Sequence, residues 1–133
     1  MEKRTPPRPT DTELEILRVL WQQGPSTVRQ AHEELTKSRF TGYTTTLKML
    51  QIMTAKGLVE RDDSQRTHVY TACLTQQQTQ RHLISDLLSR AFDGSARKLV
   101  VQALSAEKIS PRELDQIRRL LDELEGETGN ERA

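Results

Sequence analysis

Cysteine is almost missing from this sequence, because Cys73 is the only one among 133 residues. One cysteine excludes an internal disulfide and a cysteine-based metal cluster within a single chain. We expect Cys73 to be a small buried hydrophobe in a strand, with a redox-sensing thiol as the alternative.

Long apolar runs are missing as well. No stretch approaches the length of a membrane span, and the N-terminal MEKRTPPRP carries charge and proline where a signal sequence would be apolar. We therefore expect a cytoplasmic protein without membrane insertion. Residues 1–9 are predicted to form a flexible basic arm, since their prolines and charges leave nothing to pack.

Aromatic and apolar residues are few: the chain has one tryptophan, two tyrosines and two phenylalanines, and 34% of it is hydrophobic against 29% charged. Such a composition favours helices with wide polar faces and a core completed by a second subunit. The net charge is only +1. Any affinity for nucleic acid must therefore come from local clustering of cations.

The residue patterns typical of enzymes are not found. His32, His68 and His82 are not spaced with carboxylates as metal ligands, Cys73 has no evident partner, and no glycine-rich phosphate loop is present. We therefore predict no catalytic residue, no metal ligand and no cofactor. An enzyme is the least supported of the alternatives.

One segment combines basic residues with a complete lack of acids. Between residues 36 and 59 lie Lys37, Arg39, Lys48 and Lys56, and no Asp or Glu. The segment contains a predicted helix over 43–56, whose apolar spacing turns Thr46, Met49, Leu50 and Met53 toward a core. Gly57 is expected to cap its C-terminus. The outward face then carries Thr44, Thr45, Lys48, Gln51 and Ile52.

This outward face has the chemistry of a helix that lies in the major groove of DNA. Threonine and glutamine can contact base edges, and lysine reaches phosphate or guanine. The alternative for this segment alone is a solvated amphipathic helix.

Two helices are predicted before this segment and a hairpin after it. A capping box from Thr10 to Glu13 starts the first helix, which ends at Gly24, and Ser26 or Thr27 caps a second that runs to about Lys37. Short β-prone runs at 58–61 and 68–71 flank a polar turn. The fold class is thus mainly α with a small β-hairpin wing, a winged helix-turn-helix over residues 10–74.

Three further helices are predicted over residues 75–125, followed by a polar tail at 126–133. Their apolar residues are too few for an independent core, so we expect them to close across a two-fold axis in a homodimer. Packing back on the first domain is the alternative. The expected dimerisation residues are Leu83, Leu87, Leu88, Leu99, Leu114, Ile117, Leu120, Leu121 and Leu124.

Several of these pieces resemble the BlaI/MecI/CopY family of winged-helix repressors. The resemblance rests on the segments TELEIL with LW, TVRQAHEEL, YTTTL and KGLV and on the Tyr70 strand, in this order, and it covers residues 10 to about 125. It implies a homodimeric repressor on an inverted-repeat operator, with the third helix in the major groove and the C-terminal helices as the dimer interface.

The resemblance also implies partners that this sequence does not fully match. In the β-lactam branch a membrane sensor and protease triggers cleavage of the repressor at an Asn-Phe bond, and Gln102-Ala103 stand at that place here. The copper-responsive branch carries paired cysteines in its tail, which this tail lacks. The resemblance thus implies a membrane sensor and protease as a partner whose cleavage pair is replaced here, and a copper-sensing role lacks its ligands.

We expect the protein to bind double-stranded DNA. The expected base contacts are Thr44, Thr45, Lys48 and Gln51, and Tyr43 is a further expected DNA contact. The alternative is a winged-helix module that contacts another protein through its basic third helix. The expected phosphate contacts are Arg29, Lys37, Arg39, Lys56, Arg61 and Arg66, and His68 is a weaker candidate.

Overall fold

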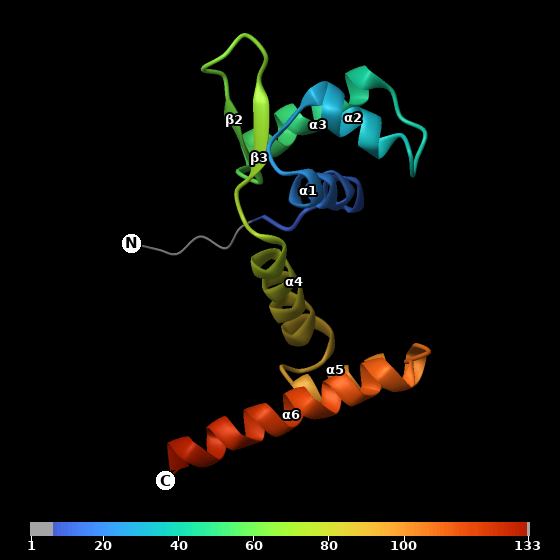
Figure 1. The fold of residues 1–133 in the computed structure, drawn as a ribbon, viewed down its shortest axis with the longest axis vertical. Coiled ribbons are helices and arrows are strands. Elements are labelled where there is room, and N and C mark those ends of the chain that lie inside the picture. Colours follow the sequence, from blue (N-terminus) through green and yellow to red (C-terminus); the bar gives the residue numbers. More distant parts are fainter. Residues whose placement is uncertain (1–6, 133) are drawn as a thin grey trace. The chain divides into compact units, whose positions relative to one another are not determined.

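A computed structural model describes residues 7–132 (Figure 1). Most of the predicted N-terminal arm, residues 1–6, lies outside the described residues. The described chain divides into two compact units, with the division between Asp86 and Leu87. The elements of the first part are α1 (Asp11–Gln23), β1 (Ser26–Thr27), α2 (Val28–Leu35), α3 (Tyr43–Lys56), β2 (Val59–Asp62) and β3 (Val69–Ala72). They are followed by α4 (Gln76–Ala91), α5 (Ala96–Ala106) and α6 (Pro111–Arg132).

The predicted caps set the limits of the first two helices. Thr10 accepts a hydrogen bond from the Glu13 amide, and the Glu13 carboxylate accepts one from the Thr10 amide, which completes the capping box of α1. Thr27 and Gln30 form the same reciprocal pair at the start of α2. Each box satisfies amide groups that a helix start would otherwise leave without partners.

The wing is a three-stranded antiparallel sheet of order β1-β3-β2. The β2–β3 hairpin was expected, and Arg61 lies opposite Tyr70 in its register. Strand β1 was not expected: Ser26 pairs with Tyr70, and Thr27 pairs with Val69. Two residues are too few to show a period-2 pattern, and one of them, Thr27, is also the N-cap of α2.

The core lies where α1, α2 and α3 pack together and against the sheet. Trp21 packs against this core, and its indole Nε1 donates to the Leu74 carbonyl at 2.9 Å. This bond fixes the segment that leaves the wing to the first helix. The buried apolar residues are Ile16, Leu17, Val19, Leu20, Val28, Ala31, Leu35, Leu50, Met53, Leu58, Val59 and Tyr70.

The second unit has no comparable core. No side chain of α5, or of α6 as far as residue 128, is buried. Leucines instead stand open to solvent, with Leu120 exposed to 53% and Leu121 to 59%. The second unit thus leaves an apolar stripe of α6 open to solvent.

Two expectations were wrong in detail. Cys73 is exposed and lies one residue beyond β3, because alternation along the strand turns it away from the buried Tyr70 side of the sheet. The last helix does not stop near Glu125 but continues to Arg132. The residues after Glu125 include no proline, and each glycine among them weakens the helix by only about 1 kcal/mol relative to alanine.

No helix within residues 7–132 combines the length and the hydropathy that crossing a lipid bilayer requires.

Candidate nucleic-acid interface

Helix α3 presents the two faces that its spacing predicts. Thr46, Leu50 and Met53 are buried, which orients the opposite side of the helix toward solvent. Gly57 adopts a left-handed conformation (φ 83°) and ends the helix, as expected. The outward residues Thr44, Thr45, Lys48, Gln51 and Ile52 are all exposed.

The start of α3 is held against α2 by one histidine. The His32 ring meets the Tyr43 ring edge to face, with centroids 5.7 Å apart. Its Nδ1 lies 3.2 Å from the Thr46 hydroxyl, and that hydroxyl donates to the Gly42 carbonyl at 3.3 Å. These contacts link the two helices of the helix-turn-helix, so that Tyr43 is held in place at the start of α3.

The cationic side chains among the predicted DNA contacts fall into two groups. Four have carboxylate partners: Lys37 with Glu34 at 2.8 Å, Arg39 with Glu15 at 3.0 Å, Lys56 with Glu13 at 2.8 Å, and Arg61 with Asp63 at 3.4 Å. Arg29, Lys48 and Arg66 form no ion pair with any residue that the structure describes. The unpaired group can therefore reach an anion without breaking an internal contact.

The Lys56 pair differs from the other three because its acid is buried. Glu13 is only 1% exposed, and the Lys56 Nζ lies 2.8 Å and 3.1 Å from its two oxygens. Burial raises the pKa of Glu13, but the Lys56 ammonium and the Thr10 hydrogen bonds outweigh it and hold this pKa below its ordinary value. Glu13 is thus charged and tied to the C-terminal end of α3.

The turn of the wing is shaped by an aspartate. The Asp62 carboxylate accepts a hydrogen bond from the Ser64 amide at 2.9 Å, and the bonds to Ser64 lower the pKa of Asp62. This is the short-range bonding by which Asp stabilises turns. It leaves Arg66, Thr67 and His68 on the strand side of the turn, all exposed.

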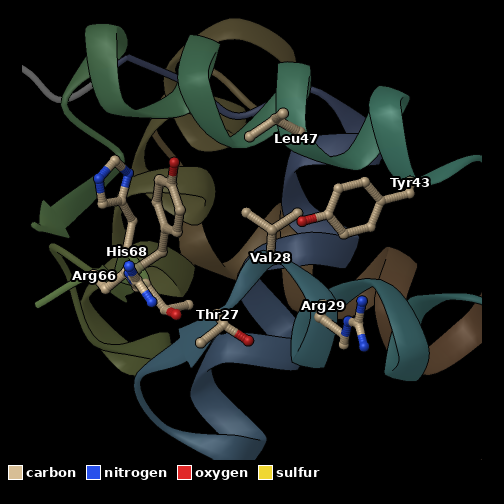
Figure 2. Close-up of a pocket in the computed structure, with 9 residues that line it drawn as sticks. Thr27, Val28, Arg29, Tyr43, Leu47, Arg66 and His68 are labelled. Carbon is tan, nitrogen blue, oxygen red and sulfur yellow. The ribbon is translucent and has the colours of Figure 1, made fainter.

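A groove of about 490 Å³ separates the wing from the helix-turn-helix (Figure 2). In this view Arg66 and His68 lie on one side, Tyr43 and Arg29 on the other, and Thr27 and Val28 between them. Leu47, Thr67 and Tyr70 complete the lining. Arg29, Tyr43 and Arg66 are far apart in the sequence, and only the fold brings them to one groove.

Helix α3, the unpaired cations Arg29, Lys48 and Arg66, and the adjoining wing together define a winged helix-turn-helix DNA-binding protein. The sequence profile described as "Penicillinase repressor" matches residues 9–123. The protein named "Transcriptional regulator BlaI" of Mycobacterium tuberculosis is 34% identical over 121 residues, which are 90% of this chain and 87% of that protein. The "Penicillinase repressor" of Bacillus licheniformis is 24% identical over 117 residues, 88% of this chain and 91% of that protein.

The chain therefore belongs to the penicillinase repressor family of BlaI/MecI transcriptional regulators. It is a DNA-binding transcriptional repressor and not an enzyme. The residues between 7 and 132 likewise hold no cluster of three or more potential metal ligands.

Two solved structures are similar over the first part of the chain. The solution structure of the DNA binding domain of the repressor BlaI has a TM-score of 0.48 at 27% identity and covers 56% of this chain and 90% of that one. The Bacillus licheniformis BlaI monomeric form in complex with the blaP half-operator has a TM-score of 0.49 at 27% identity, with 58% and 92% covered.

Proposed function

We propose that this repressor acts as a homodimer on an inverted-repeat operator, with α3 of each protomer in the major groove. The observation that carries the proposal is the outward face of α3. It has no acid, it bears Lys48 without an ion pair in the described structure, and it adjoins the wing. A helix with such a face and a neighbouring hairpin can engage a major groove and the adjacent backbone at once.

The side chains divide into those that read bases and those that hold the backbone. Thr44, Thr45, Lys48 and Gln51 are the proposed base contacts, with Tyr43 at the edge of the helix. The unpaired Arg29 and Arg66 are the first candidates for phosphate. Lys37, Arg39, Lys56 and Arg61 would each have to leave a carboxylate before they contacted DNA.

We assign dimerisation to the helices over residues 75–125 and DNA binding to the winged helix over residues 10–74. Leu87, Leu120, Leu121 and Leu124 are exposed, and Leu83, Leu88, Leu99, Leu114 and Ile117 are only partly covered. Apolar surface of this kind is stabilised when a second copy covers it. Two protomers would then read half-sites about one helical turn apart or a multiple of that.

A protease partner is not part of the proposal. Gln102 and Ala103 lie exposed within α5, at the place where the family resemblance puts the Asn-Phe pair. Without that pair, this bond gives no reason to expect cleavage by a sensor protease.

The proposal is tested by selecting bound duplexes from a random-sequence DNA library with the purified protein at moderate salt. We expect an enriched inverted repeat, with two half-sites whose spacing is constant. Salt-sensitive binding without any enriched sequence would contradict operator reading. The absence of DNA binding would make a protein the partner of α3.

A further inference from the structure

The groove between the wing and the helix-turn-helix contains a tyrosine that the fold itself leaves without a partner. Tyr70 is 1% exposed and lines the groove, yet its hydroxyl forms no hydrogen bond with any residue of the described structure. No side-chain oxygen or nitrogen buried within the described residues lacks a partner, so this hydroxyl must reach the solvent of the groove. A hydroxyl that meets water at the wall of a groove can donate to a ligand there.

The charge of the groove selects the ligand's sign. Among its nine lining residues are Arg29, Arg66 and His68, and none is Asp or Glu. The two arginines have no ion pair in the described structure, so their guanidinium groups remain available. Guanidinium and phenol groups that converge without a carboxylate favour an oxyanion, above all a phosphate.

The position of the groove indicates that this phosphate belongs to the DNA backbone. Tyr43 and Leu47 belong to α3, while Arg66, Thr67 and His68 belong to the wing. A duplex that takes α3 in its major groove and touches the wing beside it must pass its backbone between these two elements. The groove lies between them, as Figure 2 shows.

We infer that this groove holds one phosphodiester of the DNA backbone in each protomer, with the Tyr70 hydroxyl donating to it and Arg29 and Arg66 pairing with its charge. The inference rests on the proposed function and adds Tyr70 to the DNA contacts. It assigns Tyr70 two roles, as a core residue through its ring and as a backbone contact through its oxygen.

Tyr70→Phe is the first test, because it removes the hydroxyl and leaves the ring. On the duplex enriched by selection we expect about a tenfold loss of affinity, as for one hydrogen bond to a charged group. The slope of log K against log salt should stay unchanged, since no charge is lost. Arg66→Ala should instead make the slope shallower by about 1 per protomer. Arg18→Ala, an exposed α1 arginine outside the groove, is the matched control and should change neither quantity.

The contact itself is located by duplexes that carry a neutral methylphosphonate at one backbone position at a time. The wild-type protein should lose affinity at one position per half-site, and Tyr70→Phe and Arg66→Ala should both lose less at that same position. Thermal unfolding of Tyr70→Phe should match the wild type, and Arg66→Ala, a surface change, tests the same phosphate independently of folding. Equal losses for all proteins at every position would overturn the groove assignment and leave the operator-binding proposal intact. Failure of the wild type to enrich any duplex would overturn both.

Discussion

The Lys56 ammonium at the end of α3 is bound to the carboxylate of Glu13 in the first turn of α1, at 2.8 Å. Glu13 also closes the capping box of α1, so one buried acid serves a helix start and a helix end. Lys56 is 38% exposed, and its loss would leave Glu13 buried without its cation. The pair therefore positions the proposed recognition helix on α1.

Lys56→Ala should destabilise the winged helix by about 1–3 kcal/mol, below the range for a fully buried pair because the lysine is partly solvated. Lys56→Arg should recover part of this loss. Urea unfolding of the three proteins measures it. If Lys56 only contacts phosphate, Lys56→Ala will instead unfold like the wild type and give a shallower salt slope in DNA binding.

Acid should weaken the same contact. The folded pKa of Glu13 lies below its ordinary value of 4.5, so its contribution to stability is complete above pH 4.5 and is lost as the pH falls through the folded pKa. The Glu13→Gln variant has no carboxyl group at this position and cannot titrate there. We expect the difference in unfolding free energy between wild type and Glu13→Gln to shrink as the pH is lowered from 6 to about 3. A difference that does not depend on pH would show that Glu13 is not charged in the fold.

Salt dependence should count the cations that reach the backbone. If Arg29, Lys48 and Arg66 of both protomers each neutralise one phosphate, the slope of log K against log salt is about −5. If two of the eight paired cations also left their carboxylates, the dimer would neutralise eight phosphates and the slope would be about −7. Titration of the selected duplex at several salt concentrations distinguishes the two values. A slope near zero would contradict binding to the backbone altogether.

Lys48 should contribute to specificity if it reaches a base. Lys48→Ala should then weaken binding to the selected duplex by about 1–3 kcal/mol and weaken binding to random duplex much less. Gel-shift measurements on both DNAs provide the comparison, with Arg18→Ala as the charge-matched control. Equal losses on the two DNAs would assign Lys48 to phosphate.

Leu120 and Leu121 should be needed for self-association and not for the fold of the first unit. The double change to glutamate places two charges in the exposed apolar stripe of α6, and we expect the dimer to dissociate at least tenfold more readily. Gln116→Glu adds charge to α6 without replacing an apolar residue and is the control. Sedimentation equilibrium measures the association, and unchanged dimers in the double variant would contradict the proposed interface.

Local sequence patterns predicted the parts of this fold that depend on neighbouring residues. Thr10 and Glu13 are three positions apart, so their capping box could be read from the sequence, and the spacing of Thr46, Leu50 and Met53 gave the buried face of α3. The hairpin followed from β-prone runs around a polar turn. In each case the interacting residues are close together in the sequence, so the local pattern is enough to predict the structure.

Contacts between distant segments could not be predicted in this way. Lys56 and Glu13 are 43 residues apart, and no local pattern in either segment indicates that the two side chains form an ion pair. Tyr70 looked like an ordinary strand residue until the sheet placed it at the groove. Cys73 was expected to be a small buried hydrophobe in a strand, but burial depends on which side of the strand packs against the core.

The indole ring of Trp21, which donates to the Leu74 carbonyl, is also a fluorescent reporter of the fold around it. Trp21 is the only tryptophan of the chain, so the indole emission comes from the first unit alone, and its wavelength depends on the solvent that reaches this site. The circular dichroism of the helix band, at about 222 nm, in contrast has contributions from all six helices within residues 7–132. Followed together during denaturation, the two signals separate melting of the winged helix from melting of the helices that follow it.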